Sequence, residues 1–324
     1  MARAIRIERV GGPEVLTWEE IDAGEPGPGQ ARIRHAAIGI NFIDIYHRTG
    51  VYPLPLPAAL GLEAAGTVIA VGPGVTRVRP GDRVAYAGGP PGAYAEERVM
   101  GEDRLIVLPP GLDPEHAASV MFSGLTAHFL LRQVYSVRPG EVVLIHAAAG
   151  KVGLLLCQWA KHLGATVIGT VGNDAKAELV KQNGCDFPII YTREKVSESV
   201  MRITDGTKVN VVYDSVGRDT FADSLDSLRP KGMLVSFGVA SGETPPLDLR
   251  LLLSKGSLFV TRPSFGHYMG KPESYRASAD ELLALVQAGT LKIITNHQFS
   301  LREASAAHRA IEGRQTTGAC LLIP

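Results

Sequence analysis

Two patterns of hydrophobic and polar residues follow one another along the chain. Over about the first 120 residues, short alternating segments such as Ala31–Ala36 are separated by Gly/Pro turns, among them Gly72–Gly74 and Arg79–Asp82. Alternation with a period of two is typical of strands that bury one face, and turns this closely spaced favour a small β-barrel or sandwich. We therefore predict a strand-rich domain at the start of the chain.

The pattern changes near Pro114. The segment that follows is predicted to be helical, with Asp113 as N-cap and Pro114 in the first position. From Glu141 to about Thr261, short apolar runs alternate with helical segments, which is typical of a parallel sheet covered on both faces. The strands predicted there are Val142–Ile145, Thr166–Val171, Phe187–Ile190, Val209–Tyr213, Met233–Phe237 and Leu258–Val260, with helices near Lys176–Gln182, Lys195–Ile203 and Thr220–Leu228.

After Pro263 the pattern changes once more. It predicts two longer helices, about Lys271–Ala288 and Leu301–Ile311, and a short final strand, Ala319–Ile323. This tail is too small to form a domain of its own, so we expect it to rejoin the strand-rich part of the chain.

The most informative motif lies between the first two strands of the alternating region. Ala148-x-Gly150-x-x-Gly153 takes the place of the G-x-G-x-x-G fingerprint, directly after a buried strand and before an amphipathic helix. Small residues there let the backbone approach a pyrophosphate, whose charge lies on the free N–H groups of the helix N-terminus. We predict a dinucleotide-binding domain.

The end of the second strand indicates which dinucleotide is bound. An NAD site usually has a carboxylate there, which binds the ribose 2′-hydroxyl, but this strand ends in Val171-Gly172-Asn173. Asp174 follows, and we predict that it caps the next helix. Lys176, early in that helix, favours a 2′-phosphate and hence NADPH; the alternative is that Lys176 is a solvated helix lysine without a ligand.

Composition and charge exclude several other classes of function. Lys+Arg and Asp+Glu both total 33, so the net charge is zero and nothing points to nucleic acid or to an anionic membrane. No apolar stretch is long enough to span a bilayer, and the N-terminus alternates as a strand does, unlike a signal peptide. Cys157, Cys185 and Cys320 lack metal-ligand spacing, so we expect buried cysteines in a cytoplasmic protein.

Six motifs occur in a fixed order along the chain: AIGINFIDIYHRTGVYP, GLEAAGTVIAVG, RPGDRVAY, HAAAGKVG, VVYDSVG and RPSFGHY. With them the whole chain resembles the medium-chain dehydrogenase/reductase superfamily, and within it the zeta-crystallin-like NADPH:quinone oxidoreductases. The resemblance implies an α/β protein. A GroES-like, β-rich catalytic domain, residues 1–122 and 263–324, is interrupted by a Rossmann domain with a doubly wound parallel sheet, residues 123–262.

Zinc divides this superfamily. Its alcohol dehydrogenases have a zinc-binding cysteine where this chain has Asn41 and a histidine where it has Leu62, and their four-cysteine structural lobe is absent between Tyr86 and Met100. A catalytic zinc needs about three protein ligands and an open fourth position. The remaining histidines are scattered, so we expect a zinc-free reductase.

Quinones suit a reductase without metal, because they are electron-poor. The protein then has to hold the ring against the nicotinamide and donate a hydrogen bond to the developing oxyanion. The resemblance implies that Asn41 and Tyr46 supply such donors and that Tyr52 lines the pocket. The structural alternatives are that Asn41 caps a short helical turn, that Tyr46 packs on the barrel and that Tyr52 holds a tight turn.

The resemblance also assigns cofactor-binding residues along the predicted Rossmann domain and in the tail. These are Gly150, Lys151, Val152 and Gly153 at the pyrophosphate, Gly172, Lys176, Tyr191 and Arg314 around the adenosine ribose and its 2′-phosphate, Phe237, Gly238, Ser264 and Phe265 at the nicotinamide half, and Ser215. Ser215 follows a strand, at the edge where open α/β sheets bind ligands. For Tyr191 and Arg314 the alternative is an exposed residue without a ligand.

Lys151 departs from the family pattern A-A-x-G-G-V-G, which has a glycine there. The position is a variable one in the fingerprint. We therefore expect a lysine with helical φ to fit and to point its ammonium outward or weakly toward phosphate.

The strand Gly256–Thr261 ends the predicted sheet and is apolar. An exposed apolar edge strand needs a partner, and the resemblance implies a homodimer joined through this strand. The competing function is an NADPH-dependent reductase of activated C=C bonds in enones or enals, with Tyr46 or Tyr52 as proton donor. A more distant alternative is a non-catalytic NADPH- or RNA-binding protein, although zero net charge argues against RNA binding.

Overall fold

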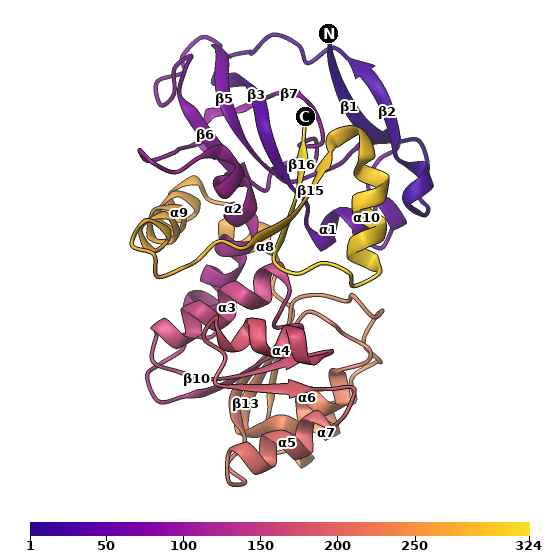
Figure 1. The fold of residues 1–324 in the computed structure, drawn as a ribbon, viewed down its shortest axis with the longest axis vertical. Coiled ribbons are helices and arrows are strands. Elements are labelled where there is room, and N and C mark those ends of the chain that lie inside the picture. Colours follow the sequence, from indigo (N-terminus) through magenta and orange to yellow (C-terminus); the bar gives the residue numbers. More distant parts are fainter. The chain divides into compact units, whose positions relative to one another are not determined.

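The computed structural model describes residues 1–324 as two compact units (Figure 1). The first unit consists of Met1–Leu125, Met269–Gln287 and Ile293–Pro324, and the second of Thr126–Tyr268 and Ala288–Lys292. The yellow end of the chain in Figure 1 lies among the indigo and violet strands, because the last strand pairs with a strand of the first unit.

The first unit is built on two sheets. The larger has the order β15-β16-β3-β5-β6-β8 with β7 paired to β3, and the smaller has the order β2-β1-β4. The strands are β1 Ala2–Ile7, β2 Thr17–Ile21, β3 Gln30–Gly39, β4 Ala58–Ala59, β5 Glu63–Val71, β6 Arg83–Ala87, β7 Glu97–Gly101, β8 Ile106–Val107, β15 Thr295–Ser300 and β16 Ala319–Ile323. All pairs are antiparallel except β15 with β16.

Alternation of buried and exposed residues accounts for the central strand of this unit. In β3, Ala31, Ile33 and His35 are buried, while the residues between them are partly or fully exposed. The buried face packs into the main core of the unit together with Val84 and Tyr86 of β6. The strand-rich domain predicted from the sequence is therefore confirmed.

Few helices accompany these sheets. They are α1 Phe42–Thr49, α2 Pro114–Phe129, α9 Pro272–Gln287 and α10 Ala304–Glu312, and α2 continues into the second unit. Helix α1 begins after Asn41 and ends at Gly50, which takes the left-handed φ of 82° that a helix C-terminus favours in glycine. Asn41 is therefore the N-cap of this short helix, and Tyr46 lies in its second turn.

The second unit is a six-stranded, fully parallel sheet of order β11-β10-β9-β12-β13-β14. Its elements are β9 Val142–Ile145, α3 Lys151–His162, β10 Thr166–Val171, α4 Asp174–Lys181, β11 Phe187–Ile190, α5 Val196–Ile203, β12 Val209–Asp214, α6 Phe221–Ser227, β13 Leu228–Ser236, α7 Leu249–Ser254, β14 Phe259–Thr261 and α8 Phe265–Met269. Strand order reverses between β9 and β12, and open α/β sheets bind ligands at the carboxyl ends of the strands there. The predicted doubly wound domain is confirmed.

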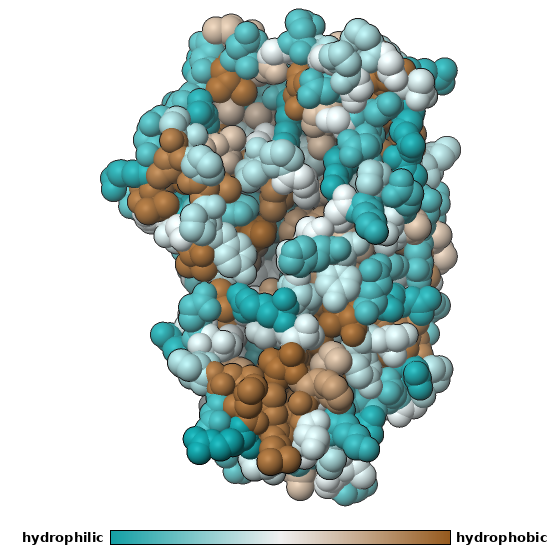
Figure 2. Space-filling view, turned by 180° about the vertical axis from the view of Figure 1, so that it is seen from behind, coloured by the Kyte–Doolittle hydropathy of each residue, from teal (hydrophilic) through white to brown (hydrophobic).

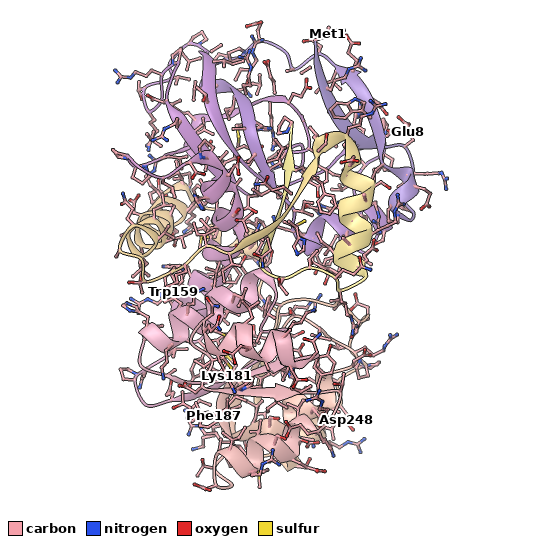
Figure 3. All side chains as sticks on the ribbon, in the orientation of Figure 1. Met1, Glu8, Trp159, Lys181, Phe187 and Asp248 are labelled. Carbon is pink, nitrogen blue, oxygen red and sulfur yellow. The ribbon has the colours of Figure 1, made fainter.

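Trp159 anchors α3, the helix that begins at the predicted fingerprint (Figure 3). Its side chain is buried and packs edge-to-face on His128, with 5.5 Å between the ring centroids. None of the helices is both long and apolar enough to cross a membrane.

Some elements differ from the prediction. Strand β13 begins at Leu228, where the pattern predicted the end of a helix. It includes the polar segment that precedes the apolar run Met233–Phe237, and it ends at Ser236. Helix α7 and strand β15 were not predicted. The strand alternates only between partly and fully exposed residues, and it is held by its hydrogen bonds to β16.

Candidate active site

The turn after β9 has the shape that a pyrophosphate site needs. Gly150 is the N-cap of α3, with φ −77° and ψ 169°, and no side chain caps the helix. A Cβ on residue 153 would lie 2.4 Å from the carbonyl oxygen of Ala147 and 2.7 Å from that of Ala148. Only glycine therefore lets helix and turn approach this closely. Because no side chain caps the helix, its N-terminal N–H groups can bind an anion.

Lys151 is the first residue of α3 and is partly buried. Its backbone is helical, so no glycine is needed at this position. Val152 follows in the same helix turn.

The carboxyl end of β10 lies beside the segment that follows β11. The N–H of Tyr191 donates to the carbonyl of Val171, and the hydroxyl of Thr192 donates to that of Gly172, both at 3.1 Å. A Cβ on residue 172 would lie 2.9 Å from the hydroxyl oxygen of Tyr191. The structure thus brings together Gly172 and Tyr191, and a Cβ on residue 172 would displace the exposed phenol of Tyr191.

Asn173, and not Asp174, caps α4. The side chain of Asn173 accepts the N–H of Lys176 at 3.0 Å. The prediction that Asp174 is the cap is wrong, because Asn173 has the extended backbone of an N-cap and Asp174 is already helical. Asp174 instead pairs with Arg193, at 2.7 and 2.5 Å between oxygen and nitrogen.

Strands β12 and β13 end side by side at the carboxyl edge of the sheet. The N–H of Phe237 donates to the carbonyl of Asp214 at 2.8 Å, and that of Ala240 to the carbonyl of Ser215 at 3.2 Å. A Cβ on residue 238 would lie 2.6 Å from the carbonyl oxygen of Ser215. The structure therefore places Ser215 against Gly238, with Phe237 next to them in the chain.

A buried polar cluster lies beneath this edge. One carboxylate oxygen of Asp214 accepts the N–H groups of Val216 and Gly217 at 2.8 and 3.1 Å, which fixes the turn after β12. The other accepts the hydroxyl of Ser224, which also lies 3.1 Å from Nε2 of His146. Burial lowers the pKa of His146, so its ring is neutral. Sequence reasoning missed this cluster; the one sign of it is a histidine directly after the buried strand β9.

Phe265 is the first residue of α8, and Ser264 directly precedes the helix. The carbonyl of Ser264 accepts the N–H of His267 at 3.1 Å. The ring of Phe265 packs edge-to-face on Phe129 at 6.2 Å, and Phe129 stacks on Tyr268 at 5.0 Å. These aromatic contacts hold α8 against the end of α2.

Tyr46 and Tyr52 lie together in the first unit. Their rings pack edge-to-face with 5.1 Å between centroids, and Phe42 packs on Tyr46 in the same way at 5.3 Å. The N–H of Tyr52 donates to the carbonyl of Tyr46 at 3.1 Å, so the segment after α1 folds back onto it. Tyr46 is buried and Tyr52 partly so.

Asn41 is buried at the start of α1. Its N–H donates to the carboxylate of Asp44 at 2.9 Å, as in a capped helix. Its side-chain amide donates to Glu63 at 2.8 Å, and the other oxygen of Glu63 accepts the N–H of Phe122 at 2.6 Å. Sequence reasoning missed Glu63, although a carboxylate in the apolar start of β5 is a visible signal of a buried polar contact.

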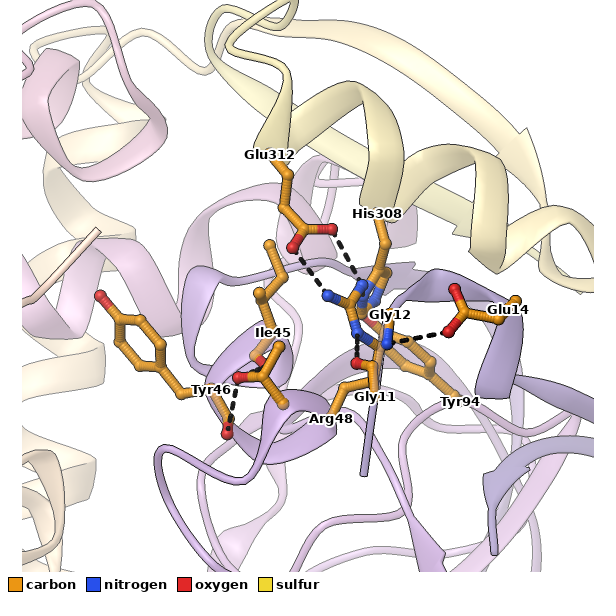
Figure 4. Close-up of polar contacts among 10 residues, drawn as sticks. Gly11, Gly12, Glu14, Ile45, Tyr46, Arg48, Tyr94, His308 and Glu312 are labelled. Carbon is orange, nitrogen blue, oxygen red and sulfur yellow. Dashed lines mark hydrogen bonds and ion pairs between the residues drawn. The ribbon is translucent and has the colours of Figure 1, made fainter. Parts of the chain in front are cut away.

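A buried polar network extends from Asp44 to α10, and Figure 4 shows the part of it around Arg48, His308 and Glu312. The hydroxyl of Tyr94 donates to Asp44 at 3.1 Å and lies 3.0 Å from Nε2 of His308. Nη1 of Arg48 lies 3.2 Å from Nδ1 of His308, and the buried guanidinium pairs with both oxygens of Glu312 at 2.9 and 2.7 Å. Sequence reasoning missed this network as well.

The direction of these hydrogen bonds follows from the chemistry of the groups. Burial and the nearby Arg48 lower the pKa of His308 to about 3, so the ring is neutral. Because arginine only donates, Nδ1 of His308 accepts and Nε2 carries the proton that it donates to Tyr94. Figure 4 shows Tyr46 pointing away from this network.

Comparison with known proteins identifies the family. Residues 27–110 match the alcohol dehydrogenase GroES-like domain, and residues 152–284 match the zinc-binding dehydrogenases. A quinone oxidoreductase of Pseudomonas aeruginosa is 52% identical to this chain over the full length of both proteins. The chain belongs to the quinone oxidoreductase family.

Two further proteins that are similar to this chain indicate the chemistry of its relatives. The solved structure of Escherichia coli quinone oxidoreductase complexed with NADPH is 45% identical, covers 100% of both chains and has a TM-score of 0.98. A 2-haloacrylate reductase of a Burkholderia species is 46% identical over 100% of this chain and 99% of the relative.

The quinone oxidoreductase family lies within the medium-chain dehydrogenase/reductase superfamily, part of which binds zinc. In this chain, no group of three or more His, Cys, Asp and Glu side chains is placed to hold a metal ion. Arg314, which the resemblance assigns to the 2′-phosphate, lies in the first unit directly after α10, while the other assigned cofactor residues lie in the second.

Proposed function

We propose that this protein reduces quinones with hydride from NADPH, without a metal. The observation that carries the proposal is the turn at Gly153, where the backbone closes so tightly onto an uncapped helix that a Cβ would not fit. The family, and a relative of 45% identity whose solved structure is complexed with NADPH, support the same cofactor. The dinucleotide, when bound, supplies the hydride.

The residues of the second unit bind and orient the cofactor in this proposal. Backbone N–H groups from Gly150 to Gly153 hold the pyrophosphate, and Lys176 with Tyr191 flanks the adenosine ribose and its 2′-phosphate. Ser215, Phe237, Gly238, Ser264 and Phe265 lie along the path to the nicotinamide.

The residues of the first unit act on the quinone. One N–H of the Asn41 amide is engaged by Glu63 at 2.8 Å, whereas the contact of the amide nitrogen to the carbonyl of Gly39 is long, at 3.4 Å. We assign the side-chain amide of Asn41 and the hydroxyl of Tyr46 as the donors to the developing oxyanion, with Tyr52 packed against Tyr46.

Steady-state oxidation of NADPH and NADH, with 1,4-benzoquinone and with 9,10-phenanthrenequinone, tests this function. We expect quinone-dependent turnover that prefers NADPH and survives a chelator. Tight binding of NADPH without turnover on either quinone would contradict the proposed activity. The assignment of NADPH as the cofactor would still stand.

A second candidate function is the reduction of activated C=C bonds, which the 46% identity to a 2-haloacrylate reductase favours. This reaction needs a proton donor for the carbon next to the activating group, and the hydroxyl of Tyr46 or Tyr52 would serve. Turnover on a naphthoquinone compared with that on an alkenal and on 2-chloroacrylate separates the two functions.

We also propose that two copies of the chain pair through β14, at the edge of the six-stranded sheet. Phe259 on this strand is 56% exposed, and Leu249 and Leu253 of α7 are 72% and 73% exposed. Figure 2 shows an apolar patch on the part of the molecule that holds this sheet. Apolar edges of this kind require a partner.

Light scattering at micromolar concentration tests the dimer. We expect twice the mass of the chain for the wild type and a monomer for Phe259→Lys, which places a charge on the pairing edge. Phe187→Lys is the matched control, because Phe187 lies on β11 at the opposite edge and is 43% exposed. A monomeric wild-type protein would contradict the proposal.

A further inference from the structure

A carboxylate follows the end of β10 in the second unit, close in sequence to the position at which an NAD site has one. Asp174 follows Gly153, the last glycine of the fingerprint, by 21 residues. In NAD sites the carboxylate that binds the ribose 2′-hydroxyl comes about 20 residues beyond the fingerprint. Asp174 is the first residue of α4, just after the end of β10. Unpaired, its charge would repel a 2′-phosphate.

The carboxylate of Asp174 is engaged by Arg193. Nη1 of Arg193 donates to Oδ1 at 2.7 Å and Nη2 donates to Oδ2 at 2.5 Å, which is a bidentate pair. The Arg193 guanidinium also lowers the pKa of Asp174, so the carboxylate is ionised at neutral pH. The two charges offset each other, and this end of the sheet lacks the net negative charge that Asp174 alone would give.

Arg193 is held here by its own segment as well as by the ion pair. The preceding residues, Tyr191 and Thr192, donate hydrogen bonds to Val171 and Gly172 at the end of β10, each at 3.1 Å. The side chain of Arg193 is exposed, and two of its five N–H groups donate to Asp174. Guanidinium groups bind phosphate through parallel hydrogen bonds. The other N–H groups of Arg193 can therefore donate to an anion.

We propose that Arg193 determines the preference for NADPH over NADH. It offsets the charge of Asp174, and it donates hydrogen bonds to the 2′-phosphate. The inference rests on the proposed function, because NADPH is the cofactor proposed there. If the pair only fastened the segment after β11 to α4, binding with and without the 2′-phosphate would depend on it equally.

The test compares Arg193→Gln, Asp174→Asn and the double variant. Arg202→Gln is the matched control, since Arg202 forms another exposed pair in the same unit, with Glu194 at 2.7 Å. Calorimetry measures the affinity for 2′,5′-ADP and for 5′-AMP, which differ in the 2′-phosphate. Steady-state kinetics with 1,4-benzoquinone gives kcat/KM for NADPH and for NADH.

We expect Arg193→Gln to weaken the binding of 2′,5′-ADP by about tenfold or more and to change that of 5′-AMP by less than about twofold. The NADPH-to-NADH ratio of kcat/KM falls by a similar factor. Asp174→Asn leaves the binding of 2′,5′-ADP unchanged or tighter, because it removes a negative charge. In the double variant it recovers part of the loss.

Two results would overturn the inference alone. In one, Arg193→Gln weakens the binding of 2′,5′-ADP and of 5′-AMP equally. The ion pair with Asp174 would then be purely structural. The other is an equal effect of Arg202→Gln, which indicates a general effect of surface charge. A wild-type protein that binds 2′,5′-ADP no more tightly than 5′-AMP would overturn NADPH as the proposed cofactor, and the inference with it.

Discussion

Asn41 and Glu63 are joined in the interior of the first unit by a hydrogen bond of 2.8 Å from the amide nitrogen to the carboxylate. The second carboxylate oxygen accepts the N–H of Phe122 at 2.6 Å, and Glu63 has no exposed surface. Because the Glu63 carboxylate is held at both oxygens, its hydrogen bond fixes the rotation of the Asn41 side-chain amide. We therefore expect Glu63 to act as a positioning residue, which sets the direction in which the proposed donor Asn41 points its amide.

We expect Glu63→Gln to lower kcat for quinone reduction about tenfold and to leave the KM for NADPH within about twofold. Glutamine has one acceptor oxygen where glutamate has two, so it cannot accept from both Asn41 and Phe122. Steady-state kinetics with NADPH and 1,4-benzoquinone gives both constants.

Glu97→Gln is the control for this substitution, because Glu97 lies on β7 of the same sheet and is partly exposed. Thermal unfolding reports the cost of an unpaired buried group, which we expect at about 1–3 kcal/mol. A lower stability of Glu63→Gln with an unchanged kcat would show that Glu63 only supports the fold.

The turn at Gly153 gives a prediction about cofactor affinity. Gly153→Ala places a Cβ 2.4 Å from the carbonyl oxygen of Ala147, so helix and turn must move apart. We expect NADPH to bind at least about tenfold more weakly. In Gly150→Ala the nearest atom is 3.2 Å away, so the effect is smaller. Fluorescence titration measures both, and equal affinities of the two variants would contradict the tight-turn argument.

Lys151 gives a prediction of the opposite kind. The residue is the first in α3 and needs no left-handed backbone, so lysine fits where relatives have glycine. We expect Lys151→Gly to bind NADPH within about threefold of the wild type, because we predict that the lysine makes at most a weak contact with phosphate. Much tighter binding by the variant would show instead that the lysine obstructs the turn.

The parallel sheet could be predicted from the sequence because its inner strands β9, β10 and β12 are largely apolar and mostly buried. β9 and β10 begin and end as the pattern indicated. Helix α7 has only six residues, and the alternation of β15 includes no buried position, so neither has a distinct hydrophobic pattern. β15 depends on β16, a pairing that appears only once the chain is folded.

The site could be predicted only as far as it is local in sequence. The turn from Gly150 to Gly153 is one continuous motif, and its strand and helix were recognisable beside it. The contact of Asn41 with Glu63 joins the start of α1 to the start of β5, and that of Arg48 with Glu312 joins residues 264 positions apart. Such pairs depend on tertiary packing, which one sequence does not reveal. Asp174 was misassigned because Asn173 and Asp174 are both good caps.

The buried network around Arg48 predicts how stability depends on pH. Burial, and then the charge of Arg48, lower the pKa of His308 from 6.5 to about 3. Between these values the unfolded state binds a proton that the folded state does not. The contribution of His308 to the free energy of unfolding is thus fully present above about pH 6.5 and is lost as the pH falls toward 3. His35, with a pKa lowered to about 4 mainly by burial, acts in the same direction.

We expect His308→Gln to flatten the slope of unfolding free energy against pH, between about pH 6 and 4, by up to about 1.4 kcal/mol per pH unit. Glutamine can accept from Arg48 and donate to Tyr94 without titrating, so the fold at neutral pH is kept. Urea unfolding followed by tryptophan fluorescence measures the slope, with His162→Gln on the exposed side of α3 as the control. Equal slopes for His308→Gln and the wild type would mean that the ring already binds its proton in the folded state. The hydrogen bond from Arg48 to His308 would then have no acceptor.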